Sequence, residues 1–149
     1  MSTDEYDFVV RGSDGSQAAI IELKNAQNLT RKDATQFRRN LVVHGFVPSA
    51  PYLLLLSQDH GYLWRDKKPS KLEVPPDAEF RMDVVIRRYV RDLGQRRLSG
   101  IEFELLVLQW LDDLNTGLVA ATEEPERTLA SLGLFNLLRG GSVEVGNAA

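Results

Sequence analysis

Residues 6–24 read YDFVVRGSDGSQAAIIELK, and this stretch decides the fold. Its two predominantly apolar segments, Tyr6–Val10 and Ala18–Lys24, are rich in the β-branched and aromatic residues that are typical of strands. Between them lies Asp14-Gly15, a dipeptide that strongly favours a tight turn. We therefore expect an antiparallel β-hairpin.

The turn also predicts the register of this hairpin. If Asp14 and Gly15 are its two central residues, opposed residue numbers sum to 29, so Asp7 lies opposite Glu22. Lys24 shares a face with Glu22 because side chains alternate along a strand, and Glu5 faces Lys24. The hairpin is thus expected to gather acids and a lysine on one face. The simpler interpretation is a solvated face with a Glu5–Lys24 ion pair.

Two carboxylates roughly 5 Å apart repel each other, and a bound cation relieves that repulsion. The chain has no cysteine and only two histidines, so hard oxygen ligands predominate and favour Mg²⁺, with Mn²⁺ as the alternative, over zinc. A lysine beside such an ion can assist an attacking water. This combination is typical of phosphodiester hydrolysis.

Downstream of the hairpin, the pattern predicts a helix and two further strands. Thr30 and Asp33 have capping-box spacing, and the helix is expected to run to about His44. Strands are expected over Pro51–Ser57 and Gly61–Trp64. Residues 66–80 contain three prolines and a charged run, which indicates a connector.

The remainder of the chain is predicted to be mainly helical. We expect helices over 82–93 and 101–115, an amphipathic segment that ends before Gly140, and a short edge strand over 143–145. Ser99 and Glu102 have capping-box spacing at the start of the second helix. The predicted fold class is α/β or α+β, a mixed sheet with flanking helices and a helical C-terminal extension. Its parts are a core over 1–65, a connector over 66–80 and an extension over 81–149, all within one domain.

Asp7, the run Ile21-Glu22-Leu23-Lys24 and the helix that follows them resemble the PD-(D/E)xK nuclease superfamily, which has the restriction-endonuclease-like fold. The resemblance covers about residues 5–65. It implies that Asp7 and Glu22 hold the metal, with the backbone carbonyl of Leu23 as a further ligand. It also implies that Lys24 assists the water and that Gln36, on the next helix, supports the site.

The chain departs from this family pattern in two ways. The family usually has a helix and a strand before the aspartate strand, whereas only six residues precede Asp7, and Tyr6 replaces the family's proline. We expect either that the reading frame starts late or that Val143–Val145 fills the vacant edge of the sheet. The family's N-terminal helix and strand are expected to be missing.

Charge is unevenly distributed along the chain. Residues 1–100 carry 16 basic and 13 acidic side chains, whereas residues 101–149 carry 2 and 8. A basic surface that contacts nucleic-acid phosphates is therefore compatible with the overall net charge of −3. The residues expected to form it, which could equally be solvated helix faces, are Arg31, Lys32, Arg38, Arg39, Arg87, Arg88 and Arg91.

These features predict an Mg²⁺-dependent nuclease acting on nucleic acid, with DNA as the first choice of substrate. The alternative is a non-catalytic module of the same fold that binds nucleic acid or protein, or a DNA-binding subunit whose cleavage partner lies elsewhere. Cutting both strands would require a homodimer or a larger complex. We expect a cytoplasmic location, because no secretory signal and no membrane-spanning run is visible.

Overall fold

The hairpin predicted for residues 6–24 is present, as β1 (Phe8–Arg11) paired antiparallel with β2 (Gln17–Leu23). Val10 faces Ala19 and Phe8 faces Ile21, which is the predicted register. The hairpin reaches this register through a wider turn and a compensating bulge. The turn is wider than predicted, because the N–H of Gly12 donates to the carbonyl of Ser16. A bulge between Val10 and Arg11 then restores the register.

The computed structural model describes residues 6–45, 50–65 and 72–146. Within them, six strands form one mixed sheet in the order β5-β4-β3-β2-β1-β6. The added strands are β3 (Tyr52–Leu56), β4 (His60–Arg65), β5 (Ala78–Arg81) and β6 (Ser142–Val145). Only the β2–β3 pair is parallel among these described strands. The chain therefore has an α+β fold with a mixed sheet.

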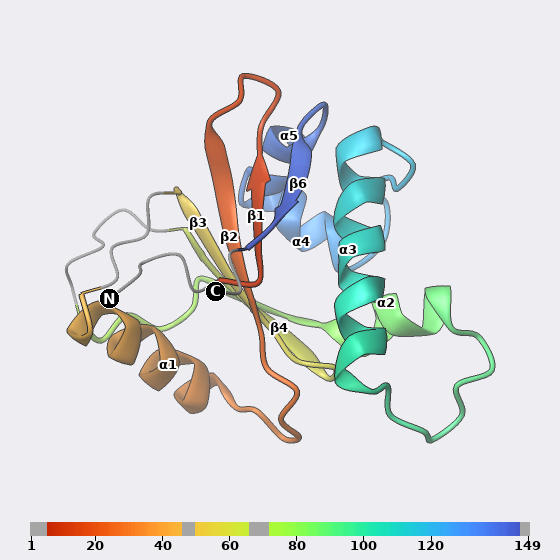
Figure 1. The fold of residues 1–149 in the computed structure, drawn as a ribbon, viewed down its shortest axis with the longest axis horizontal. Coiled ribbons are helices and arrows are strands. Elements are labelled where there is room, and N and C mark those ends of the chain that lie inside the picture. Colours follow the sequence, from red (N-terminus) through yellow and green to blue (C-terminus); the bar gives the residue numbers. More distant parts are fainter. Residues whose placement is uncertain (1–5, 46–49, 66–71, 147–149) are drawn as a thin grey trace.

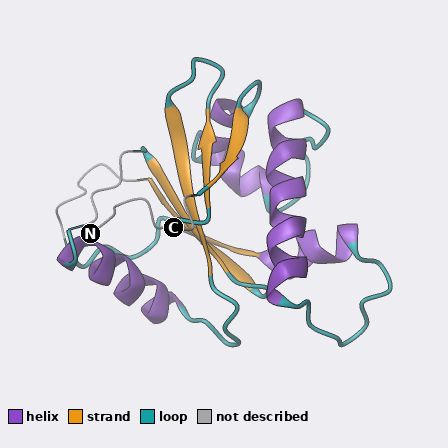
Figure 2. Ribbon diagram, in the orientation of Figure 1, coloured by secondary structure: helices purple, strands orange, loops and turns teal. Residues whose placement is uncertain are grey.

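Helices cover both faces of the sheet, as Figures 1 and 2 show. Helix α1 (Arg31–Val43) lies on one side, and α2 (Met82–Tyr89), α3 (Gly100–Thr116), α4 (Glu126–Ser131) and α5 (Leu134–Leu138) lie on the other. Both predicted capping boxes, Thr30 with Asp33 and Ser99 with Glu102, are confirmed. No helix in the described part of the chain is long and apolar enough to cross a membrane.

The two-sided cover explains the continuous apolar run of β3, in which every residue is buried. Leu53 and Leu55 pack on the α1 side, whereas Leu54 and Leu56 pack on the side of α2–α5. Trp64 and Trp110 also lie in the core, because both side chains are almost fully buried. Both faces of the sheet therefore contribute to the core.

The C-terminal half differs from the prediction in three places. The last three residues of the connector expected over 66–80 belong to the four-residue strand β5, whose short pattern closely follows the prolines. Helix α2 ends at Tyr89 rather than Leu93. The amphipathic segment forms two helices instead of one, because Gly133 adopts a left-handed conformation between α4 and α5.

The predicted edge strand is confirmed. Strand β6 pairs antiparallel with β1, with Val143 opposite Val10 and Val145 opposite Phe8. The hairpin strand β1 is therefore flanked on both sides, by β2 and by β6. The C-terminal residues thus complete the sheet on the side where the sequence suggested a vacant edge.

A buried ion pair links three helices on the α2–α5 side. Glu126 on α4 is fully buried and accepts two hydrogen bonds from Arg88 on α2, at 2.6 and 3.0 Å. It also accepts one from the indole N–H of Trp110 on α3, at 2.8 Å. Because a buried charge is costly unless it is paired, this contact fixes the relative positions of the three helices.

Glu126→Gln should lower the free energy of unfolding by about 1–3 kcal/mol, because it leaves the Arg88 guanidinium without its counter-charge. The matched control is Glu144→Gln, which removes the half-exposed Arg11–Glu144 pair and should cost less than about 1 kcal/mol. Urea denaturation measures both. Equal losses in the two variants would contradict the structural role of the buried pair.

Tyr62 on β4 generates a prediction for alkaline pH. Burial, assisted by the charge of Glu79, raises the pKa of Tyr62 to about 12, and its hydroxyl donates to the Leu29 carbonyl. The unfolded pKa is about 10. The resulting stabilisation is present below pH about 10 and lost as pH rises to about 12. Between pH about 10 and about 12, the unfolding free energy of wild type should therefore fall more than that of Tyr62→Phe. Denaturation at a series of pH values measures both, and an equal fall in the two proteins would refute this prediction.

Candidate functional site

The polar residues singled out from the sequence lie at one end of the sheet. Strands β2 and β3 are parallel and finish together, with Leu23 opposite Leu56. Strand β1 runs the other way, so its start lies at the same end. Asp7 immediately precedes β1, and Lys24 immediately follows β2. The topology therefore brings Asp7, Glu22 and Lys24 to a common end of the sheet.

Asp7 is held there by a hydrogen bond that the sequence pattern did not predict. Its carboxylate Oδ2 accepts from the backbone N–H of Leu23 at 2.7 Å. The last regular pair between β1 and β2 at this end is Phe8 with Ile21. The N–H of Asp7 donates to the carbonyl of the same Ile21, at 3.2 Å. The predicted direct opposition of Asp7 and Glu22 is therefore replaced by a bend at Asp7. The carboxylate instead contacts the residue between Glu22 and Lys24.

This bond also orients the backbone of Leu23. In a strand, the N–H and C=O of one residue point to the same neighbouring strand. The N–H of Leu23 points to Asp7, whereas that of Lys24 donates to Leu56 of β3. The Leu23 carbonyl consequently lies on the Asp7 side of β2. A carboxylate and a backbone carbonyl are thus directed to the same side of the strand.

Glu22 and Lys24 lie on the α1 face of the sheet. Ile20 packs in the core beneath α1, and Glu22 shares its face because side chains alternate along the strand. Glu22 is half-buried and Lys24 is exposed. The Lys24 ammonium lies 5.3 Å from the centroid of the Phe37 ring on α1, a cation–π contact. Phe37 therefore holds the lysine on the same face as Glu22.

The hydrogen bond described for Gln36 does not tie it to this group. The Gln36 amide donates to the Asn40 side chain at 3.0 Å, along the exposed surface of α1. Glu5, which was expected to face Lys24, lies outside the described residues. The three residues whose placement the fold supports are Asp7, Glu22 and Lys24.

The donor set suits a hard cation with few protein ligands. No group of three or more His, Asp or Glu residues in the described segments could hold a metal ion. What the site offers is two carboxylates and the Leu23 carbonyl, all oxygen donors. Mg²⁺ is usually bound through one or two carboxylates while it keeps several waters. The residues present therefore fit Mg²⁺ better than a metal that needs a full protein cage.

The basic residues predicted to contact nucleic acid do not form one surface. Those of α1 and those of α2 lie on opposite sides of the sheet (Figure 1). Arg38 is fully buried, so its guanidinium has no surface to offer a phosphate, and its expected role is wrong. Arg88 is bound to Glu126. The exposed or half-exposed residues that remain are Arg31, Lys32 and Arg39 on the α1 side and Arg87 and Arg91 on the other.

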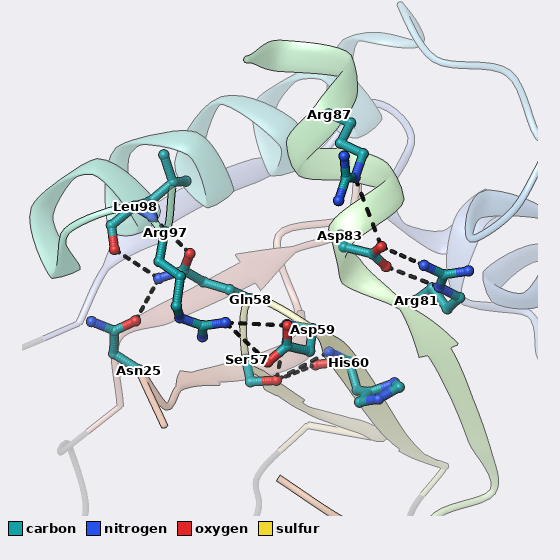
Figure 3. Close-up of polar contacts among 10 residues, drawn as sticks. All are labelled: Asn25, Ser57, Gln58, Asp59, His60, Arg81, Asp83, Arg87, Arg97 and Leu98. Carbon is teal, nitrogen blue, oxygen red and sulfur yellow. Dashed lines mark hydrogen bonds and ion pairs between the residues drawn. The ribbon is translucent and has the colours of Figure 1, made fainter. Parts of the chain in front are cut away.

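A second polar group at the same end of the sheet was missed by the sequence analysis. Asp59 follows β3 and pairs with Arg97 at 3.2 Å, while Asp83 on α2 pairs with Arg81. Gln58 donates to the side chain of Asn25 at 2.6 Å (Figure 3). Its residues are scattered from 25 to 97, so no local spacing could have revealed it. Only the strand order, which places the ends of β2 and β3 together, provides a signal.

Comparisons with known proteins add no assignment: the chain matches no family model, no curated protein and no solved structure.

Two substitutions separate the structural and chemical roles of Asp7. Asp7→Ala removes the acceptor of the Leu23 N–H, so that amide should exchange its hydrogen at least about tenfold faster. Asp7→Asn keeps an acceptor oxygen and should largely retain the protection. Residue-resolved hydrogen exchange measures both, with the Phe8 amide as internal reference. Unchanged exchange at Leu23 in Asp7→Ala would show that the bond is absent in solution.

Proposed function

We propose that this protein is a metal-dependent nuclease of the PD-(D/E)xK type, with a restriction-endonuclease-like core. The observation that carries the proposal is the 2.7 Å hydrogen bond between the Asp7 carboxylate and the N–H of Leu23. It joins the aspartate to the middle residue of Glu22-Leu23-Lys24, the tripeptide that provides the other two functional groups. The two separate parts of the sequence that carry the family resemblance are therefore adjacent in the structure.

The arrangement of elements also supports the proposal. The hairpin of β1 and β2 is followed by the helix α1, as the family resemblance implies, and then by β3, which pairs parallel with β2. The parallel β2–β3 pair requires a crossover, which α1 supplies. The same helix covers the face that carries Glu22 and Lys24.

In the proposed site, Asp7, Glu22 and the Leu23 carbonyl would hold Mg²⁺, or Mn²⁺ in its place. When bound, the ion would lower the pKa of a water and offset charge on the phosphate. The protein itself positions the Asp7 carboxylate and the Lys24 ammonium. The Leu23 N–H fixes the Asp7 carboxylate through Oδ2. Phe37 keeps the Lys24 ammonium on the Glu22 face, where it can stabilise negative charge on a phosphate or orient the attacking water.

Nucleic acid is the proposed substrate, and its contacts are assigned to the α1 side. Lys32 is exposed, and Arg39 is only weakly tied, at 3.8 Å from Glu73. Arg31 donates to the Pro76 carbonyl and is exposed. These cations share the face of the sheet that carries Lys24. Phosphate contacts of this kind supply affinity that does not depend on sequence and that falls with salt.

The experiment is a cleavage assay with Mg²⁺ or Mn²⁺ on plasmid, linear and single-stranded DNA and on RNA. Lys24→Ala should lower the cleavage rate by roughly 10²-fold or more, since it removes a group that acts directly on the reacting atoms. The matched control is Lys32→Ala, which removes another exposed lysine, from α1. It should weaken binding only modestly. No metal-dependent cleavage by wild type, or equal cleavage by wild type and Lys24→Ala, would refute the proposal.

A non-catalytic module is the alternative, and one observation favours it. Both Asp7 and Lys24 have structural partners, the Leu23 N–H and the Phe37 ring, that would explain their positions without chemistry. In that case the α1 surface would bind nucleic acid with steep salt dependence but without metal-dependent cleavage. The same preparation tests both ideas, because binding and cleavage are measured on identical DNA.

A further inference from the structure

Two adjoining pockets lie where β3 ends and α2 begins. The first, of about 200 Å³, lies between α2 and the loop 93–97, and we refer to it as the Arg97 pocket. The second, of about 340 Å³, is lined by Asn28, His60 and Arg81. Asp59 and Asp83 line both pockets, so the two form one polar depression. Figure 3 shows the side chains of this region.

The Arg97 pocket is rich in guanidinium groups. Arg87, Arg96 and Arg97 line it, against the two carboxylates of Asp59 and Asp83. Arg87 and Arg96 are more than half exposed, so each can turn donors toward a ligand. Arginines fixed on one side by an acid, with donors remaining on the other, are suited to bidentate recognition of phosphate.

The guanidinium group of Arg97 has one nitrogen without a hydrogen-bond acceptor among the described residues. Its Nη1 is occupied by the Asp59 carboxylate, at 3.2 and 3.3 Å from the two oxygens. Its Nη2 is shielded from solvent and has no hydrogen-bond acceptor among the described residues. A buried donor without an acceptor is unfavourable. A ligand oxygen that reached this atom would satisfy it.

The carboxylates do not make this depression a cation site. Asp59 is paired with Arg97, and Asp83 is paired with Arg81 and lies 3.9 Å from Arg87. A metal ion would have to displace these guanidinium groups. The acids instead hold the arginines in place, and the guanidinium groups outnumber them.

The Arg97 pocket adjoins the loop that follows Lys24 in the sequence. Gln58 lines the Arg97 pocket and donates to Asn25, the residue directly after Lys24. Asn28, further along the same loop, lines the second pocket. A strand of nucleic acid whose phosphate lies near Lys24 would therefore have this depression within reach along the same end of the sheet.

We propose that the Arg97 pocket binds the phosphate group of a nucleotide. Arg87, Arg96 and Arg97 contact the phosphate, while the aliphatic side chains of Ile86 and Leu93 on the pocket wall contact the sugar or base. As a subsite for the strand being cut, the pocket rests on the proposed nuclease function, although binding itself requires no cleavage. The shared chemistry is the phosphate, whether a terminal monoester or an internal diester.

Calorimetry in EDTA tests this with adenosine 5′-monophosphate, adenosine and inorganic phosphate as probes. The monophosphate should bind at least about tenfold more tightly than adenosine, and Arg96→Gln and Arg87→Gln should each weaken it about tenfold. The matched control is Arg91→Gln, an exposed arginine of the same region that does not line the pocket, and it should bind like wild type. Thermal melting verifies that all variants are folded.

A second arm distinguishes the source of the phosphate. Preferential binding of a 5′-phosphorylated oligonucleotide over its 5′-hydroxyl form identifies a terminal monoester, and equal Arg96-dependent binding of both identifies an internal diester. Equal affinity for the monophosphate and for adenosine would refute the proposed phosphate site, even if Lys24-dependent cleavage is observed. Unchanged affinity for the monophosphate in Arg96→Gln and Arg87→Gln would refute it too. Arg96-dependent binding without metal-dependent cleavage would support the pocket and refute the nuclease.

Discussion

The proposed site depends on one hydrogen bond, from the N–H of Leu23 to the carboxylate of Asp7. It forms where β1 ends its pairing with β2, so the side chain of Asp7 satisfies a backbone donor that a longer β1 would have paired. The same contact places a carboxylate beside Leu23 and leaves the Leu23 carbonyl on that side of β2. The same residue therefore meets a local requirement of the sheet and supplies a carboxylate to the proposed metal site.

The rest of the fold keeps this end of the sheet in place. Strand β6 flanks β1, and the parallel strand β3 flanks β2, so neither strand of the hairpin is at an edge. Helix α1 contributes Phe37, which contacts Lys24. On the opposite face, the buried Glu126 joins α2, α3 and α4 through Arg88 and Trp110. That network also explains why Arg88 is unsuited to bind nucleic acid, since its guanidinium is already paired.

Local patterns predicted those parts of the structure that local physics determines. The hairpin, both capping boxes and the β6 strand follow from turn chemistry, cap spacing and alternation. The bend at Asp7 and the burial of Arg38 did not follow, because they depend on where the sheet ends and on what α1 packs against. The Arg97 pocket could not be predicted from the sequence for a similar reason. Its residues come from segments that only strand order brings together.

Paramagnetic line broadening by Mn²⁺, followed at the backbone amides of the full chain, tests the proposed metal site directly. Broadening at low Mn²⁺ should be centred on Asp7, Leu23 and Lys24, and added Mg²⁺ should reverse it. Glu22→Gln should weaken it. Broadening centred on Asp59 and Asp83, or the absence of any localised effect, would contradict the assignment of the metal site to the Asp7–Leu23 end of the hairpin.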